Sequence, residues 1–427
     1  MMTINNGSGF PDRQRDGQIP AGIYVHIPFC VRKCIYCDFN SYAGCSDETV
    51  NGYFSALEKE ARLLKELAEQ GQKEKAVPVP LQETRVSLEK QLKRYAAEVL
   101  PADSLFIGGG TPSLADPLYI ERLLSILPLS AEAEVTIEAN PGTLTPEKLS
   151  VYRKAGINRL SLGVQSFNDR ELSFLGRIHD AKEAVSSFQA ARTAGFDNIS
   201  LDLMFGFPGQ TMLSWKETLR KAVDLEPEHL SFYSLQIEEG TPLYRMFRND
   251  EIDQLSDEAD REMYHYAVRF LTEKGYRLYE ISNASRQGRE CRHNLKYWTM
   301  VPYFGIGAGS HSWLNGIRYA SPGELGAYHS LVEEMAAEGL YFEKRGEALY
   351  RNTPEDSMSD HMFTGLRLRE GVDLREFARR YQVDPEEKYR DAIQKHLMDG
   401  TMVMEQGRLK FTEKGIDLSS YILIDFI

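Results

Sequence analysis

The 427-residue sequence predicts an α/β fold: a partial barrel of about six βα units, like an incomplete TIM barrel, followed by a mostly helical C-terminal domain. Short, apolar, β-rich runs alternate with amphipathic helical patterns, and parallel neighbouring strands need such helical crossovers. Several runs are apolar at consecutive positions, as expected for strands that are covered on both faces. Six such units fall short of the eight that close a full barrel.

The predicted elements follow one another in this alternation. Strands are expected at Ile23–Ile27, Ser104–Gly108, Glu134–Ala139, Arg159–Val164, Ile199–Gly206 and His229–Leu235. Helical patterns between them cover Pro146–Ala155, Ala181–Ala194 and Leu213–Leu225.

The pattern divides the chain into four segments. We expect a tail at 1–20, a core barrel at 21–245, a barrel extension with a Gly-rich loop at 246–320, and a helical unit at 321–427. Within the barrel, helical patterns around Glu48–Gln70 and Gln82–Leu100 are separated by Pro78 and Pro80, which break any helix. We therefore expect residues 66–103, approximately, to form an exposed polar insertion with a flexible joint.

The sequence pattern changes after the last predicted barrel strand. A helix at Asp257–Lys274 leads to a strand at Tyr276–Ser282 and then to the loop GIGAGSHSW. Further helices are expected at Glu324–Gly339, Pro354–Glu370, Leu374–Tyr381 and Pro385–Met398. Two short alternating runs around 406–407 close the chain. Helices followed by a hairpin resemble a winged-helix unit, here a lid that contacts protein or substrate.

Composition excludes several classes of protein. Lys and Arg total 50 against 63 Asp and Glu, so the net charge of −13 argues against a nucleic-acid-binding surface. The polar N-terminal residues lack an apolar signal core, and no run of ~18 apolar residues predicts a membrane span. Only 5 cysteines are present, three of them close together, which favours a reduced, cytoplasmic metal site over a disulfide framework.

Those three cysteines directly follow the first predicted strand. In YVHIPFCVRKCIYCDF, Cys30, Cys34 and Cys37 have the spacing C-x3-C-x2-C. Such a loop can wrap one corner of a cuboidal iron–sulfur cluster, leaving the fourth iron open for chemistry. The plainer alternatives are zinc completed by His26 or Cys45, or simply buried cysteines. Structural zinc usually shows two separated ligand pairs, which are missing here.

With the aromatic Tyr36 before its last cysteine, this motif resembles that of the radical S-adenosylmethionine (SAM) superfamily. The resemblance implies a 4Fe–4S cluster whose open iron binds the amino and carboxylate groups of SAM. It also implies that an electron from the cluster cleaves SAM to methionine and a 5′-deoxyadenosyl radical. The protein would orient SAM and keep water away from the radical.

Later strands end in residues that suit a ligand site. GGGTPS at 108–113 ends the second strand, where glycines let backbone amides approach a ligand carboxylate. Glu138, Gln165 and Asp202 each close a further strand, at the mouth where βα barrels bind ligands. Singly, a tight turn or a helix cap is the ordinary explanation for such residues. Several consecutive strands that end alike favour a site.

With Arg177 in LGRIHD, these residues match the coproporphyrinogen-dehydrogenase-like branch of the superfamily over most of residues 20–320. Asp202 is the expected ribose partner, because a carboxylate accepts hydrogen bonds from hydroxyls. Arg177 can pair with a carboxylate through two donors. The resemblance implies SAM contacts from Tyr24, Gly109, Gly110, Thr111, Glu138, Gln165, Arg177 and Asp202.

The chain departs from the coproporphyrinogen dehydrogenases at two places. Phe39 stands where they carry a fourth cysteine, and their long N-terminal extension is absent. Phe39 and the motif H-N-x-x-Y-W at 293–298 are similar to the HemW-type haem chaperones instead. That resemblance implies haem binding and transfer to acceptors such as respiratory haem enzymes, with which a peripheral membrane contact is compatible. The alternative is an oxygen-independent coproporphyrinogen III oxidase.

By the same resemblance, the haem contacts are His293, Asn294, Tyr297 and Trp298. Haem iron accepts His, Cys, Met or Tyr ligands, so His293 is the expected ligand, with Cys291 and His311 as further candidates. The plainer alternative is that His293 and Asn294 fix a loop and that the two aromatic residues belong to the core. Cys45 lies outside the motif spacing and is expected to be structural.

Overall fold

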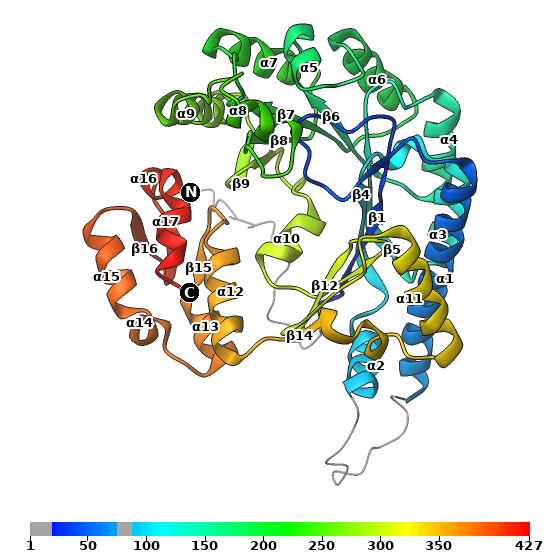
Figure 1. Cartoon of the computed structure of the whole chain (residues 1–427). Helices are drawn as coiled ribbons and strands as arrows, with labels where there is room; N and C mark the ends of the chain where they lie inside the picture. The colour runs from blue at the N-terminus through cyan, green and yellow to red at the C-terminus, as the bar shows by residue number, and fades with distance from the viewer. Residues whose placement is uncertain (1–18, 75–87) are drawn as a thin grey trace, which may run out of the picture.

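The computed structural model describes residues 19–74 and 88–427. The greater part of the predicted tail and the Pro78–Pro80 joint lie outside these residues. In the described part, one large sheet of twelve strands forms the centre of the molecule, in the order β14-β13-β12-β11-β1-β4-β5-β6-β7-β8-β10-β9. Figure 1 shows helices around the outside of this curved sheet and the C-terminal unit, in orange and red, beside it.

Seven neighbouring strands of the sheet run parallel. Each of the six predicted barrel strands is present, and β11 adds a seventh because it pairs in parallel with β1. The seven strands are β1 (Gly22–Ile27), β4 (Ala102–Gly109), β5 (Leu129–Ala139), β6 (Arg159–Gln165), β7 (Ile199–Phe205), β8 (His229–Ser234) and β11 (Tyr303–Ile306).

Helices connect these strands and cover the outer face of the sheet. Aspartate or threonine side chains cap several of them, as expected for N-cap residues. They are α1 (Asp47–Glu74), α2 (Leu88–Val99), α3 (Pro117–Ile126), α4 (Pro146–Ala155), α5 (Asp169–Phe174), α6 (Ala181–Thr193), α7 (Met212–Asp224), α8 (Pro242–Arg248) and α9 (Asp257–Glu273), with a 3-10 turn η1 (Pro112–Leu114).

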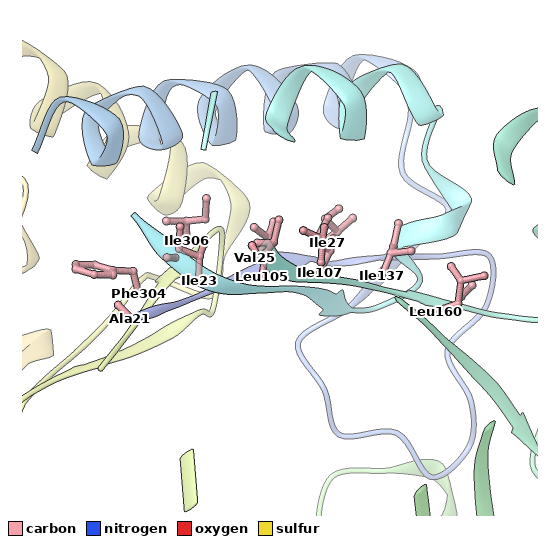
Figure 2. Packing of buried hydrophobic residues seen from close by; sticks show 14 of the residues in the cluster. Ala21, Ile23, Val25, Ile27, Leu105, Ile107, Ile137, Leu160, Phe304 and Ile306 are labelled. Atoms are coloured by element: carbon pink, nitrogen blue, oxygen red, sulfur yellow. The ribbon is translucent and has the colours of Figure 1, made fainter. Parts of the chain in front are cut away.

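Alternate residues of the strands point to opposite faces of the sheet. Figure 2 shows Ile23, Val25 and Ile107 directed toward the helices, and all three are completely buried. Burying each such side chain contributes roughly 1.5–3 kcal/mol, so this layer holds the barrel wall in place. The residues of opposite parity, such as Tyr24 and His26, face the barrel interior.

Antiparallel strands extend both edges of the parallel sheet. The predicted strand at Tyr276–Ser282 is the short edge strand β9. One edge carries β10 (Asn283–Ser285) and β9 (Arg277–Glu280), and the other carries β12 (His311–Leu314), β13 (Ile317–Ala320) and β14 (Leu349–Arg351).

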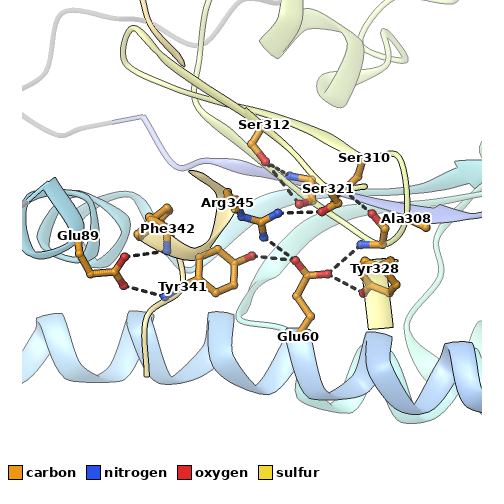
Figure 3. Close-up of polar contacts among 12 residues, drawn as sticks. Glu60, Glu89, Ala308, Ser310, Ser312, Ser321, Tyr328, Tyr341, Phe342 and Arg345 are labelled. Atoms are coloured by element: carbon orange, nitrogen blue, oxygen red, sulfur yellow. Dashed lines mark hydrogen bonds and ion pairs between the residues drawn. The ribbon is translucent and has the colours of Figure 1, made fainter. Parts of the chain in front are cut away.

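The prediction of an exposed insertion at about 66–103 is wrong for its second half. Helix α2 packs on α1 and buries Leu92 and Ala96. The buried carboxylate of Glu89 accepts the backbone N–H groups of Tyr341 at 2.8 Å and Phe342 at 2.7 Å (Figure 3). Glu89, which the charge pattern predicted to be exposed, thus fixes the backbone at Tyr341 and Phe342. These contacts anchor α2 to the body of the protein.

The C-terminal unit begins later in the structure than the predicted boundary at 321. Helix α11 (Leu325–Glu338) packs against α1, and the 3-10 segment η2 (Glu343–Ala348) leads into β14 of the main sheet. The remaining helices and a separate three-stranded sheet, β15-β17-β16, form a winged-helix-like unit. They are α12 (Pro354–Gly365), β15 (Val372–Asp373), α13 (Leu374–Tyr381), α14 (Pro385–Lys388), α15 (Arg390–Met398), β16 (Met402–Glu405), β17 (Arg408–Phe411), α16 (Glu413–Asp417) and α17 (Ser419–Ile424).

Two predicted C-terminal helices differ from the observed ones. The pattern at Pro354–Glu370 forms a helix only as far as Gly365, and the pattern at Pro385–Met398 is divided at Tyr389. In the described residues, no helix combines the length and the apolar character that crossing a bilayer requires.

Candidate functional site

The three clustered cysteines lie on the loop that follows β1, at the C-terminal mouth of the barrel. A short parallel pair, β2 (Phe29–Cys30) and β3 (Tyr42–Ala43), closes this loop on itself. The backbone N–H of Thr111 donates to the Phe29 carbonyl at 2.8 Å, which joins the cysteine loop to the glycine motif. A Cβ at Gly110 would lie 2.7 Å from the Phe29 carbonyl oxygen, so this close approach requires glycine.

A continuous chain of polar contacts links two of the thiols. Thr111 Oγ1 lies 3.7 Å from the Sγ of Cys30 and accepts a hydrogen bond from Asn140 Nδ2 at 2.9 Å. Arg177 donates to Asn140 Oδ1 through Nη2 and lies 3.7 Å from the Sγ of Cys34 through Nη1. The chain holds the cysteine loop against the barrel strands, with the Arg177 guanidinium directly beside the Cys34 sulfur.

This donor set fits a cluster with one open iron. Burial raises the pKa of the Cys30 and Cys37 thiols, so neutral thiols are favoured until a metal displaces their protons. His26, which zinc would use as a fourth ligand, has both ring nitrogens engaged, with the Tyr24 hydroxyl at 2.9 Å and the Asn40 carbonyl at 2.8 Å. Across the described chain, no three His, Cys, Asp or Glu side chains are gathered for a single metal ion.

A cavity of about 140 Å³ lies directly in front of the thiols. It is open to the barrel mouth and is lined by residues of β4, β5, β6, β7 and β8 together with the segment between α5 and α6. Seven of the eight predicted SAM contacts line it, beside all three cysteines: Gly109, Gly110, Thr111, Glu138, Gln165, Arg177 and Asp202.

Two carboxyl groups face this cavity. Burial and the charge of Asp202 raise the pKa of Glu138 to about 8, although the Gly109 N–H donates to its carboxylate at 3.2 Å. Burial also raises the pKa of Asp202, whose two oxygens accept hydrogen bonds from Ser161 at 3.0 and 3.1 Å. Two such groups in one small cavity are suited to pair with a cation and to accept hydroxyl donors.

Arg177 and Gln165 are held more tightly than a ligand contact requires. Arg177 also donates to the Gly163 carbonyl at 2.6 Å, so only its buried Nε lacks a partner. Gln165 has a positive φ of 66°, which is unusual for a residue with a side chain, and it accepts the Tyr233 hydroxyl at 2.8 Å. Strain of this kind is typical of positions that a binding site fixes.

The sequence-based prediction missed several residues that line the same cavity. The signal was present, because Asn140 follows Glu138 at a strand end, and Ser161 and Tyr233 share the inward parity of the predicted residues. Gly163 shares that parity, since it lies between Ser161 and Gln165 on β6, and a Cβ there would lie 3.1 Å from the Asn140 side chain. The missed residues include Asn140, Ser161, Gly163 and Tyr233.

A second, larger cavity of about 380 Å³ adjoins the first. Phe39, Gly109 and Glu138 line both cavities, so they form a shared wall. Tyr24, the eighth predicted SAM contact, lies in this second cavity instead of the first. The remaining lining residues are His26, Asn40, Tyr297, Tyr303, Gly309 and His311.

The H-N-x-x-Y-W motif forms the short helix α10 (Arg292–Trp298) behind the second cavity. His293 is 1% exposed; its Nδ1 lies 3.1 Å from the Ser104 hydroxyl and its Nε2 lies 2.9 Å from the Tyr297 hydroxyl. Burial and neighbouring cations lower its pKa to about 3. In this geometry His293 has no free nitrogen for iron, and it serves to orient Tyr297, which does reach the cavity.

The other motif residues lie away from the cavity lining. The guanidinium of Arg367, from the C-terminal unit, lies over the Trp298 ring at 4.5 Å and within 3.5 Å of Glu280. Trp298 therefore joins the barrel to the C-terminal unit. Asn294 is half-buried, and Cys291 is completely buried at the start of α10.

Two family models match the chain: the Radical SAM superfamily over residues 24–222 and the HemN C-terminal domain over residues 352–418. The fold and the cysteine site thus define a radical SAM protein, a superfamily whose members hold a 4Fe–4S cluster and SAM.

Curated relatives give the family. The heme chaperone HemW of Bacillus subtilis is 37% identical over 363 residues, which are 84% of this chain and 86% of the relative. The heme chaperone HemW of Lactococcus lactis is 31% identical over 414 residues, which are 96% and 98% of the two chains. This chain belongs to the HemW family of radical SAM proteins.

A solved structure confirms the predicted fold class. The coproporphyrinogen III oxidase HemN from Escherichia coli superposes with a TM-score of 0.75 over 96% of this chain and 90% of its own, at 21% identity. The α/β barrel and the helical C-terminal domain are therefore shared with that radical SAM enzyme.

Proposed function

We propose that this chain is a cytoplasmic haem chaperone, which binds haem beside a 4Fe–4S cluster and SAM and transfers the haem to acceptor proteins such as respiratory haem enzymes. The observation that carries the proposal is the pair of adjoining cavities with a common wall. One cavity contains three thiols and polar groups, and the other is large and mainly aromatic. Cavities of several hundred Å³ with a few polar groups are typical of sites for small molecules and cofactors.

The smaller cavity suits the cluster and SAM. In this proposal the thiols of Cys30, Cys34 and Cys37 hold the cluster, which supplies an open iron and an electron when bound. The glycines at 109 and 110 bring backbone close to the amino-acid end of SAM. Asp202, held by Ser161 and Ser200, accepts the ribose hydroxyls. SAM contacts are assigned to Gly109, Gly110, Thr111, Glu138, Gln165, Arg177 and Asp202, with Tyr24 in the adjoining larger cavity.

The larger cavity suits a flat aromatic ligand. Tyr297 and Tyr303 pack edge to face, with ring centres 4.5 Å apart, and present an amphipathic surface to the cavity. His293 keeps the Tyr297 hydroxyl in position, while Trp298, under the Arg367 guanidinium, holds the end of α10 in place; Asn294 lies half-buried between them in the motif. The motif thus contributes to haem binding mainly through Tyr297.

Phe39 distinguishes the haem-chaperone function from the alternative, the oxidative decarboxylation of coproporphyrinogen. It is 62% exposed and lines both cavities at the position where coproporphyrinogen dehydrogenases carry a fourth cysteine. An apolar ring there suits a wall against which a porphyrin packs. We therefore expect haem binding without oxidative decarboxylation of coproporphyrinogen.

A transfer experiment tests the proposal. The anaerobic, cluster-loaded protein is charged with one equivalent of haem and mixed with a haem-free acceptor enzyme, and recovery of acceptor activity is compared with free haem at the same concentration. We expect faster or more complete reconstitution from the chaperone. A parallel assay contains SAM, a reductant and coproporphyrinogen; formation of protoporphyrinogen there, without haem transfer, would overturn the proposal in favour of the oxidase.

A further inference from the structure

The larger cavity contains two histidines with very different surroundings. His26 is buried, and both of its ring nitrogens have hydrogen-bond partners, so it is already committed to the barrel wall. His311 is exposed at the first position of β12, whose other three residues are buried. Within the chain that the structure describes, neither ring nitrogen of His311 has a hydrogen-bond partner.

The backbone that carries His311 is nevertheless fixed by buried contacts of the loop that precedes it. The preceding loop, residues 307–310, packs onto a completely buried ion pair between Glu60 and Arg345, 2.7 Å apart. Glu60 also accepts the Gly307 N–H at 2.9 Å and the Tyr328 hydroxyl at 2.7 Å. Figure 3 shows this network beneath Ala308 and Ser310. A buried charge with all of its oxygens engaged holds the loop in one arrangement.

Two further contacts fix the position of His311. A Cβ at Gly305 would lie 2.1 Å from the His311 carbonyl oxygen, so the two strands approach closely only because residue 305 is glycine. Asn40, in the cysteine loop, donates to the carbonyls of Ala308 at 3.3 Å and Gly323 at 3.0 Å. The loop before His311 is therefore tied directly to the segment that carries the three clustered cysteines.

We infer that His311 is the protein ligand of the haem iron, and that the porphyrin occupies the larger cavity against Tyr24, Tyr297 and Tyr303. This inference rests on the proposed haem-chaperone function and names the ligand that function needs. A neutral imidazole with a free nitrogen binds haem iron, and a rigid support lowers the entropic cost of binding. His293, the ligand expected from the sequence, is enclosed and has both nitrogens engaged.

The position of His311 also suits a chaperone. The residue lies at the open edge of the cavity, where an incoming acceptor ligand can reach the iron, whereas His293 lies behind the cavity wall. Haem held here shares the wall of Phe39, Gly109 and Glu138 with the cluster and SAM cavity. A ligand bound in the smaller cavity can therefore affect haem binding through direct contact with these three wall residues.

A ligand exchange tests the inference. Haem is titrated into anaerobic, cluster-loaded protein, and absorption and electron paramagnetic resonance spectra are recorded for the wild type and for the His311→Cys, His293→Cys and His329→Cys variants. His329 is a matched control, since its side chain is 53% exposed on α11 and it does not line the cavity. We expect only His311→Cys to move the Soret band of the ferrous carbonmonoxide complex to the long wavelength of thiolate-ligated haem.

A second variant separates ligation from folding. His311→Ala should lower haem affinity roughly tenfold or more, as for lost metal-site contacts, and added imidazole should restore the wild-type spectrum. A spectral change in His293→Cys, with none in His311→Cys, would overturn this inference and leave the haem-chaperone proposal standing. Failure of the wild type to bind haem stoichiometrically would overturn the proposed function itself.

Discussion

Replacing Glu138 by Gln should change the protons released when SAM binds. Burial and the charge of Asp202 raise the pKa of Glu138 to about 8, so at pH 7 about 90% of this carboxyl is protonated in the free site. A cationic group of SAM, its ammonium or its sulfonium, binds the ionised form. Binding at pH 7 then removes about 0.9 proton from Glu138, and the ionisation costs about 1.4 kcal/mol, a tenfold effect on affinity.

Titration calorimetry of the anaerobic, cluster-loaded protein measures this directly. Experiments at pH 7 in two buffers of different ionisation enthalpy give the number of protons released. Protons that SAM itself loses are common to both proteins, so the wild type should release about 0.9 more than Glu138→Gln. Glu147→Gln is the control, because Glu147 is exposed in the first turn of α4. Equal proton release by wild type and Glu138→Gln would refute a cation-binding role for Glu138.

Three further changes probe the site and its support. Asp202→Ala should weaken SAM binding by about 1–3 kcal/mol in the same calorimeter, because a buried hydroxyl loses its acceptor; unaltered affinity would leave Asp202 a structural role only. Arg345→Met should lower the free energy of unfolding in denaturant by about 3–5 kcal/mol, since Glu60 remains buried and unpaired; a loss below about 1 kcal/mol would contradict the buried pair. His293 has a pKa of about 3 when folded against 6.5 as the ordinary value, so the unfolded chain binds its proton first as the pH falls. Relative to His293→Gln, the free energy of unfolding of the wild type should therefore decrease below pH 6.5, by about 2 kcal/mol at pH 5. The same pH dependence of stability in both proteins would refute this assignment.

Local pattern predicted the barrel and its smaller cavity well. Inward and outward residues alternate along every strand, so inward-facing polar residues of β4 to β7 meet in one cavity. Glu138 and Gln165 lie at strand ends as expected, but the expectation that Asp202 closes a strand is wrong, because it lies in the middle of β7. The same reasoning extended one strand further would have found Tyr233, the last residue but one of β8, which has the same parity. The cysteine spacing needed no knowledge of the fold.

The larger cavity could not be predicted in the same way. Apart from Gly109 and Glu138 of the shared wall, its lining comes from β1, the cysteine loop and the segment from 297 to 311, and these meet because β11 pairs in parallel with β1. Pairing between strands so distant in sequence leaves no local periodicity. That both nitrogens of His293 are engaged could not be predicted either, because one of its hydrogen-bond partners, Ser104, lies 189 residues away on β4.

Polar residues that are buried far from the site were the other source of error. Glu89 and Glu60 lie in helices whose charge patterns predict solvent exposure, yet both carboxylates are buried and bind segments some 250 residues away in sequence, such as the Tyr341 and Gly307 N–H groups. A buried carboxylate is stable only with such partners, and partners at that separation become visible only in the folded chain. Glu89 lies in the second half of the expected insertion, the half that is packed against the body of the protein.

Iron and sulfide analysis after anaerobic reconstitution tests the cluster assignment most directly. The wild type should contain about four iron and four sulfide per chain, and its reduced electron paramagnetic resonance signal should change when SAM is added, because one iron is open. The Cys30→Ala, Cys34→Ala and Cys37→Ala variants should each lose the cluster, whereas Cys45→Ala should retain it. Full iron and sulfide in any of the first three variants, or zinc in their place in the wild type, would contradict the assignment.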